Sequence, residues 1–261
     1  MGDLITALQQ NFCAAPRIAP VVQHVDDPSF RSIQRIAALK IAPSRRLNLA
    51  LGQARMTSPR ITLHKGDLPA GLAFPKGVAI DSETLGLKPH RDRLCLVQLS
   101  GGDNTVHLVQ LDGQDWSAPH LKALLADDKT LKIFHFARFD VAVLERYLGV
   151  TTTPIWCTKI ASKLVRTYTD RHGLKDLCAE LIGLDLSKQQ QSSDWAAATL
   201  TQQQLAYAAS DVLHLHALKA RLEAMLVRES RLAVAEACFR FLPVRARLDL
   251  DGFEDQDLFS H

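Results

Sequence analysis

The sequence has no run of about 18 apolar residues, the length from which a membrane-spanning helix is inferred. Its first residues include Asp3 and scattered polar side chains at the place where a secretory signal would have its apolar centre. We therefore expect neither export nor a membrane segment, and we expect the protein to be cytoplasmic.

Cysteine is scarce, with five residues that lie far apart in the chain. No Cys-x-x-Cys pair occurs, so neither a zinc site nor a disulfide framework is indicated, and a reducing compartment fits best. Internal repeats and low-complexity tracts are also missing. The absence of a P-loop argues against a nucleotide phosphotransferase.

Strong positive charge is missing from most of the chain, although the formal net charge is +3. Residues 1–55 contain seven Lys and Arg against three Asp and Glu, so the remainder has a formal charge of about −1. If the main domain binds nucleic acid, metal ions and a local patch must neutralise the phosphates, because the global charge does not.

The first 55 residues differ from the rest. Prolines at positions 16, 20, 28 and 43 interrupt any long helix, and Ser44-Arg45-Arg46 is basic. The segment could be an Arg-rich targeting peptide, a nucleic-acid arm, a poorly ordered tail, or sequence upstream of a natural start at Met56. We expect one folded domain over residues 56–261, which ends in a short helical tail.

The pattern from residue 60 onward predicts an α/β fold, which opens with a short edge element at 62–68. Apolar, β-prone runs at 77–83, 93–100 and 105–111 follow one another closely, and the turn signal at 101–104 predicts a hairpin, so these three strands form an antiparallel meander. Two more strands are expected at 130–135 and 154–157, with helices at 119–125, 137–147, 158–166, 173–182 and about 201–226. This order predicts a mixed five-stranded sheet flanked by helices.

Two carboxylates end the first strand, in Gly77-Val-Ala-Ile-Asp-Ser-Glu83. Alternate side chains of a strand share a face, so Asp81 and Glu83 point the same way, about 7 Å apart. Two acids on one face of a buried strand repel each other unless a cation lies between them, and hard oxygen ligands suit Mg²⁺ or Mn²⁺. Taken alone, the pair also fits a solvated turn.

Three further residues extend this pattern. Asp140 lies in the first turn of a helix that leaves the fourth strand, where α/β sheets carry functional groups but where an acid also stabilises the helix end. Tyr207 and Asp211 share one face of a largely buried helix. A buried carboxylate needs a partner, because leaving it unpaired costs several kcal/mol. Taken alone, Tyr207 is more typical of a core position with its hydroxyl satisfied.

The order Asp-x-Glu on a strand, Asp after His-Phe-x-x-Phe, and Tyr-x-x-x-Asp on a late helix resembles the DEDD superfamily of 3′–5′ exonucleases. The chain is most similar to its tyrosine-containing branch and to ribonuclease D, because the histidine branch would place His where Ala206 stands. The resemblance runs from about residue 60 to about 225. The first 55 residues have no counterpart in compact members, and the C-terminal helical domains of longer members have none in this sequence.

The resemblance implies an RNase H-like sheet in a single exonuclease domain with two divalent metal ions, Mg²⁺ or Mn²⁺. It implies that Asp81 bridges both ions, that Glu83 and Asp211 complete one site, and that Asp140 serves the other through water. Tyr207 would orient the attacking water. The implied reaction releases nucleoside 5′-monophosphates from single-stranded RNA 3′ ends, in tRNA precursors or small RNAs. A DNA exonuclease and an inactive RNA-binding module are the alternatives, and the presence of all four carboxylates disfavours the second.

Substrate contacts are predicted from position in this scheme. They are Ser82, Thr84, Leu85, Gln98, His135, Arg138 and Lys188. Leu85 is expected to wedge against the last base. Arg138 and Lys188 are expected to contact phosphates, although each also fits a solvated surface charge. Trp195 is expected to pack its loop rather than to stack on a base.

Overall fold

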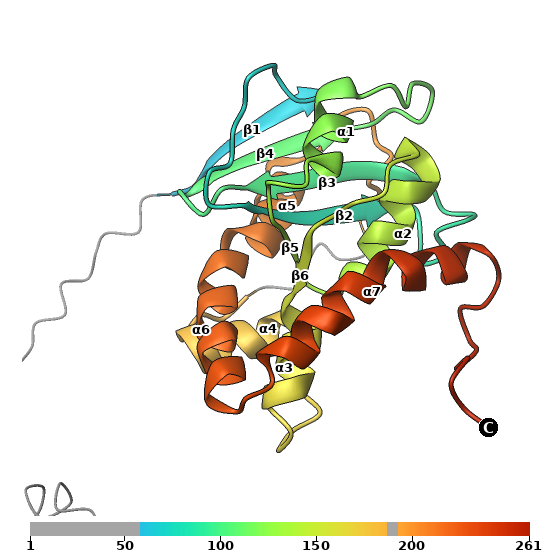
Figure 1. Cartoon of the computed structure of the whole chain (residues 1–261). Coiled ribbons are helices and arrows are strands. Elements are labelled where there is room, and N and C mark those ends of the chain that lie inside the picture. The colour runs from blue at the N-terminus through green and yellow to red at the C-terminus, as the bar shows by residue number, and fades with distance from the viewer. Residues whose placement is uncertain (1–57, 187–192) are drawn as a thin grey trace, which may run out of the picture. The chain divides into compact units, whose positions relative to one another are not determined.

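A mixed sheet of six strands lies at the centre of the computed structural model, which describes residues 58–186 and 193–261. The strand order is β1-β4-β3-β2-β5-β6 (Figure 1). The strands are β1 (Arg60–Lys65), β2 (Val78–Thr84), β3 (Leu94–Ser100), β4 (Thr105–Gln110), β5 (Lys132–Phe134) and β6 (Ile155–Cys157). The predicted α/β class with a mixed sheet is confirmed, but the predicted number of five strands is one too few.

The additional strand is β1, which the sequence indicated only as a short edge element. It pairs in parallel with β4, with Arg60 opposite Thr105 and Lys65 opposite Gln110. Its side chains are exposed or half-buried, whereas every residue of β3 is buried. An edge strand with one neighbour lacks the continuous apolar run that marks a central strand, so its sequence signal is weak.

The direction of pairing changes at β2. This strand runs antiparallel to β3, with Asp81 opposite Gln98, and parallel to β5. The predicted meander of β2, β3 and β4 is therefore present, and β5 and β6 extend it in parallel. The pairing of β2 with β3 shifts its register between Glu83, opposite Leu96, and Thr84, opposite Leu94, directly after the two acids.

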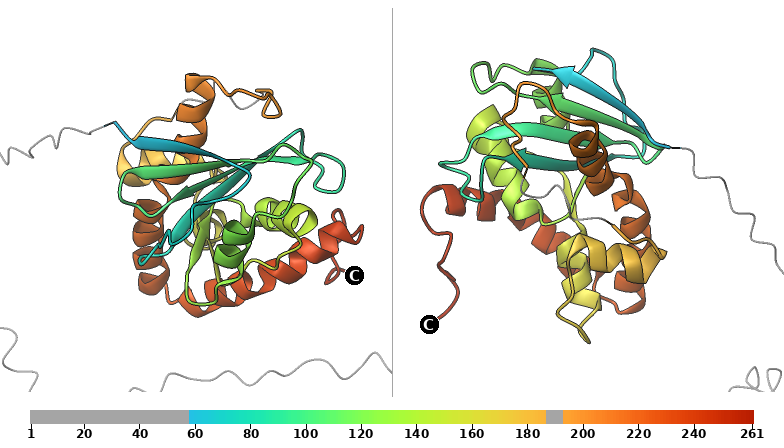
Figure 2. Two further views of the ribbon diagram at one scale, coloured as in Figure 1. Left: turned by 90° about the horizontal axis from the view of Figure 1, so that it is seen from above. Right: turned by 180° about the vertical axis from the view of Figure 1, so that it is seen from behind.

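Helices cover both faces of the sheet. α5 (Gln202–Leu213) packs on the meander strands, and α2 (Ala137–Leu148) packs on β2, β3, β5 and β6. Figures 1 and 2 show α2 in front of the sheet and α5 behind it. The other helices are α1 (Pro119–Ala126), α3 (Thr158–Val165), α4 (Leu174–Leu177), the π-helix η2 (Cys178–Ile182), α6 (Leu215–Arg228) and α7 (Leu232–Leu250).

The long helix expected over about 201–226 is two helices, which meet at His214. α5 packs on the sheet, whereas α6 packs on α3, η2 and β5. Because the chain is divided at His214, one continuous apolar stretch of sequence packs first on the sheet and then on α3 and η2. Among the described residues, no helix combines the length and the apolar character that crossing a bilayer would need.

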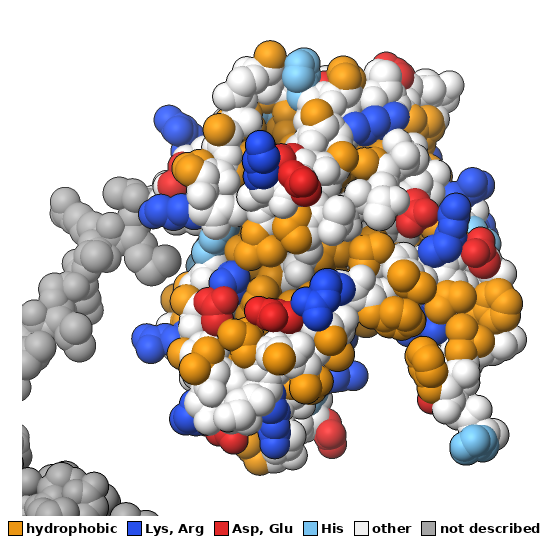
Figure 3. Space-filling model, in the orientation of Figure 1, with side chains coloured by type: hydrophobic (Ala, Val, Ile, Leu, Met, Phe, Trp, Pro, Cys, Tyr) orange, Lys and Arg blue, Asp and Glu red, His pale blue; other side chains and the backbone are white. Residues whose placement is uncertain are grey.

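The end of α7 and the segment that follows it are both tied to α2. Arg138 donates to both carboxylate oxygens of Asp249, at 2.6 and 2.7 Å, and to the carbonyl of Glu254 at 2.6 Å. Exposed apolar side chains gather around this segment and α7 (Figure 3). They include Phe241, Val244, Phe253, Leu258 and Phe259. The expected N-terminal extension, residues 1–55, lies outside the described residues and stays a prediction.

Candidate active site

Three acids converge where β2 meets α5. One carboxylate oxygen from each of Asp81, Glu83 and Asp211 lies within 4.8 Å of the others. Asp81 and Glu83 are separated by one residue of β2 and therefore leave the strand on the same face. All three side chains are half-buried, so the group is set into the molecule but can still be reached from outside.

The start of α5 is fixed by a reciprocal pair of hydrogen bonds. The Gln204 N–H donates to Thr201 Oγ1 at 3.2 Å, and the Thr201 N–H donates to Gln204 Oε1 at 2.9 Å. This capping box satisfies two backbone donors that the helix itself leaves free. Since α5 then continues without interruption, Tyr207 and Asp211 lie one turn apart on the side that faces Asp81.

Asp140 occupies the first turn of α2 and is almost fully buried. The Ser82 hydroxyl donates to its Oδ1 at 2.6 Å. Asp140 is thus turned toward Ser82 and lies outside the three-acid group, but its charge still raises the pKa of Asp81. The structure brings all four predicted acids into one region and orients one of them differently.

The acids raise one another's pKa. Burial raises the pKa of Glu83 to about 9, and the charges of Asp211 and Asp140 add to the shift. Burial also raises the pKa of Asp140 to about 7, and that of Asp211 to about 7 with a contribution from Asp140. Burial and the neighbouring acids hold the pKa of Asp81 well above its usual range. A group of converging oxygens that retains protons at neutral pH fits divalent cations, which would replace those protons.

Tyr207 lies beside these acids. Burial raises its pKa, and the charges of Asp211, Glu83 and Asp81 raise it further. Its hydroxyl therefore stays protonated at neutral pH and can donate a hydrogen bond. The ring centroid lies 6.1 Å from that of Trp195, which is buried as the sequence led us to expect. These surroundings suit a residue that orients a nucleophile better than one that removes a proton.

A cavity of about 690 Å³ opens over the acids. The predicted site residues that line it are Asp81, Ser82, Glu83, Thr84, Leu85, His135, Tyr207 and Asp211. Leu85 is 52% exposed, so an apolar side chain projects at the rim. Lys188 lies outside the described residues, so its predicted phosphate contact stays a prediction.

Two predicted substrate contacts lie elsewhere. Gln98 does not line the cavity but is fully buried, and its Nε2 donates to Glu83 Oε1 at 3.4 Å. Gln98 lies on β3, opposite Asp81, and therefore holds the Glu83 carboxylate from the neighbouring strand. Arg138 is occupied by Asp249 and the C-terminal segment, so its guanidinium is not available to a phosphate at the cavity.

Lys175 is a cavity residue that the sequence did not single out. In the described part of the chain it is the one Lys or Arg side chain that lines the cavity, next to Gly173 and Leu174. Its ammonium lies 3.0 Å from Asp185, and this ion pair is exposed. A lysine in a short helix carries no sequence signal of its own, because the fold alone brings this helix to the cavity.

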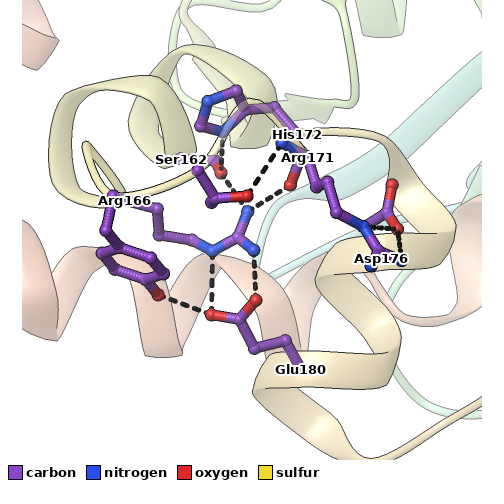
Figure 4. Close-up of polar contacts among 8 residues, drawn as sticks. Ser162, Arg166, Arg171, His172, Asp176 and Glu180 are labelled. Atoms are coloured by element: carbon purple, nitrogen blue, oxygen red, sulfur yellow. Dashed lines mark hydrogen bonds and ion pairs between the residues drawn. The ribbon is translucent and has the colours of Figure 1, made fainter.

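A buried arginine braces this wall (Figure 4). Arg166 is fully buried and donates to the carboxylate of Glu180, to the Arg171 carbonyl at 2.6 Å and to Ser162 Oγ at 3.0 Å. His172 Nδ1 lies 2.8 Å from the same Ser162 hydroxyl. The network joins α3, the following loop and η2, so it fixes the ends of the segment from which residues 173–175 face the cavity.

Comparison with known proteins places the chain at the level of a family. Residues 69–227 match the model of a family described as 3′–5′ exonuclease. Ribonuclease D from Acidiphilium cryptum is 34% identical over 161 residues, which are 62% of this chain and 41% of that protein. The chain spans less than half the length of the curated ribonuclease D relatives that it matches.

Solved structures extend the likeness. Brucella melitensis NrnC bound to pGG is 56% identical with a TM-score of 0.76, over 78% of this chain and 100% of that one. The same protein with bound Mg²⁺ is 55% identical with a TM-score of 0.75, over 77% and 99%. Escherichia coli RNase D, an exoribonuclease involved in structured RNA processing, is 28% identical with a TM-score of 0.59, over 67% and 45%.

Proposed function

This chain belongs to the 3′–5′ exonuclease family, and on that premise we propose that it is a metal-dependent exoribonuclease. It shortens single-stranded RNA from a free 3′ end and releases nucleoside 5′-monophosphates. The observation that carries the proposal is the convergence of Asp81, Glu83 and Asp211 beside Tyr207 in one cavity. The ribonuclease D relatives support RNA as the substrate class.

The substrates that we propose are short RNAs, down to two nucleotides, rather than long structured precursors such as tRNA. Two observations support short substrates. The cavity volume of about 690 Å³ is that of a small-molecule site, for which about 300–1,000 Å³ is usual. A similar protein, Brucella melitensis NrnC, was solved with pGG. We place the reaction in the cytoplasm, where the free cysteines of the described residues would stay reduced.

We propose two divalent ions, Mg²⁺ or Mn²⁺, as cofactors. Asp81, Glu83 and Asp211 would hold them together with Asp140. When bound, such ions supply an activated water and stabilise charge on the phosphate and the leaving oxygen. The raised pKa values of Asp140 and Asp211, both about 7, support this assignment, because cations would relieve the repulsion that keeps protons on the acids.

The side chains themselves have separate tasks in this scheme. The Tyr207 hydroxyl donates a hydrogen bond to the attacking water and orients it toward the phosphorus. Ser82 holds Asp140 in one orientation. Lys175 contacts a phosphate at the rim. As the water oxygen bonds to phosphorus and gives up a proton to solvent, the bond to the 3′ oxygen breaks and that oxygen takes up a proton. The shortened RNA therefore ends in a 3′-hydroxyl, and the phosphate leaves with the terminal nucleoside.

The test is an assay with 5′-labelled RNA and DNA of one sequence, each with a 3′-hydroxyl or a 3′-phosphate, in Mg²⁺, Mn²⁺ or a chelator. We expect a ladder from the 3′-hydroxyl RNA with either metal and none with the chelator. Asp81→Asn protein, purified in the same way, controls for contaminating nucleases. Faster hydrolysis of DNA would favour the DNA exonuclease alternative, and no metal-dependent hydrolysis of either strand would contradict the proposal.

A further inference from the structure

His135 lines the cavity and also takes part in a hydrogen-bond network with Thr158 and the Phe134 carbonyl. It follows the last residue of β5. Its Nδ1 lies 2.8 Å from the hydroxyl of Thr158, the fully buried first residue of α3. That hydroxyl also donates to the carbonyl of Phe134 at 3.0 Å. One nitrogen of the ring is therefore fixed by α3 and the end of β5.

These contacts assign the tautomer of His135. A threonine hydroxyl has one hydrogen to give, and a carbonyl oxygen can only accept. Because Thr158 gives its hydrogen to Phe134, it can only accept from His135, so the ring proton lies on Nδ1 and Nε2 carries a lone pair. Burial, with the charge of Lys159 adding, lowers the pKa of His135 to about 3, so the ring is neutral at physiological pH.

The second nitrogen, Nε2, belongs to a ring that lines the cavity, and in this tautomer it can accept a hydrogen bond. Within residues 58–186 and 193–261, Nε2 has no hydrogen-bond partner and is not one of the buried polar atoms without one. Phosphate oxygens only accept hydrogen bonds, so they gain nothing from this atom. A sugar hydroxyl can donate to it, and the 2′-hydroxyl is the group that separates RNA from DNA.

We propose that Nε2 of His135 accepts a hydrogen bond from the 2′-hydroxyl of the 3′-terminal ribose and so selects RNA over DNA. The inference rests on the proposed function and names the atom that reads the sugar. Thr158 is the positioning residue, since it holds the proton on Nδ1. Recognition of this kind uses a neutral acceptor next to the acids, where a cationic side chain would pair with a carboxylate instead.

The experiment compares a short RNA with the same RNA that carries 2′-fluorine on its last nucleotide, a group that cannot donate. For the wild-type full chain we expect kcat/KM to fall about tenfold with the fluorinated end, the loss of one hydrogen bond to an acceptor that is left unpaired. His135→Phe should hydrolyse both RNAs at one reduced rate. Thr158→Val should also lose the discrimination because the proton can move to Nε2, whereas Thr158→Ser should keep it.

The outcomes separate this inference from the proposed function. If wild-type protein hydrolyses both RNAs equally in Mg²⁺, or if His135→Phe keeps the tenfold ratio, the sugar-reading role is wrong and the exoribonuclease assignment stands. If His135→Phe instead needs a higher metal concentration for half-maximal activity while the ratio of kcat/KM between the two RNAs is unchanged, the ring serves the metal site. The inference is then again wrong. If the variant does not fold, the wild-type comparison and the Thr158→Val and Thr158→Ser pair still decide. No hydrolysis of any RNA contradicts the proposed function itself.

Discussion

Burial raises the pKa of Asp81, and the neighbouring acids Asp140, Asp211 and Glu83 raise it further. We predict that Asp81→Asn and Asp211→Asn each lower kcat at least about a thousandfold, since the residues that would hold the metals must supply several kcal/mol of charge stabilisation. Asp128→Asn, at an exposed position, is the matched control and should leave kcat unchanged. Steady-state hydrolysis of labelled RNA measures the effect, and activity retained in Asp81→Asn would remove the acid from the mechanism.

Tyr207 differs from the acids because it would act on the water rather than on a metal. We predict that Tyr207→Phe lowers kcat about a hundredfold, because the attacking water loses the hydrogen bond that orients it. The half-saturating metal concentration should not change, because the ring keeps its place beside Trp195. Measuring the rate at increasing metal concentration gives kcat and the half-saturating metal concentration separately. A wild-type kcat in Tyr207→Phe would rule out the orienting role.

The raised pKa values give the metal-free protein a definite pH dependence. Asp140 and Asp211, with a pKa of about 7 in the fold and about 4 when unfolded, bind more protons in the folded state between these values. Their contribution to stability is therefore fully present below about pH 4 and is lost as the pH rises through about 7. We expect the Tm in chelator to fall between pH 5.5 and 8, and added Mg²⁺ to raise it more at pH 8. An equal rise in Tm on adding Mg²⁺ at pH 5.5 and at pH 8 would contradict the link between metal binding and the protonation of these acids.

At the scale of elements, the wall that carries Lys175 depends on Arg166. We predict that Arg166→Met lowers the free energy of unfolding by about 2–3 kcal/mol, because the buried Ser162 hydroxyl and the part-buried Arg171 carbonyl lose their donor. It should also raise KM, as the segment 173–175 loses its brace. Glu180→Gln should cost less, since its side chain is 43% exposed and water can replace the ion pair. Urea unfolding and steady-state kinetics check both, and equal losses would argue against a buried role for Arg166.

Most elements could be predicted from the sequence because their apolar patterns are local. The meander, β5, β6 and the first helix after β5 are present close to the expected bounds. β1 was indicated only as an edge element and not counted as a strand of the sheet, because an edge strand pairs on one side only. The division at His214 was missed because the apolar pattern continues through it while the packing partners change from the sheet to α3. Both features depend on tertiary neighbours rather than on local sequence.

The acids of the site were predictable for a similar reason. Asp81 with Glu83, and Tyr207 with Asp211, are close in sequence, so one strand and one helix place each pair. Arg138 was misplaced because its partner, Asp249, lies 111 residues further on and belongs to a segment without motifs. Sequence spacing predicts which side chains share a strand or helix. It does not predict which side chains will form an ion pair with a residue of a distant element.

At the scale of the whole molecule, the parts that form the cavity all lie between Asp81 and Asp211. We therefore predict that deleting residues 1–55 leaves the hydrolysis of short RNA unchanged, because the strands and helices around the cavity begin after this segment. Rates of the full and shortened chains, with thermal melts of both, check this. An inactive or unfolded product would show that the segment belongs to the domain.

The pairing of Trp195 with Tyr207 also has an optical consequence. The indole is buried in the cavity wall, 6.1 Å from a phenol that the proposed water would contact, and its Nε1 has no hydrogen-bond partner among the described residues. Its emission should respond when a ligand displaces solvent from the cavity, whereas Trp116 and Trp156 lie outside the lining. Intrinsic fluorescence of Asp81→Asn protein would then follow nucleotide occupancy directly, without a label and without turnover.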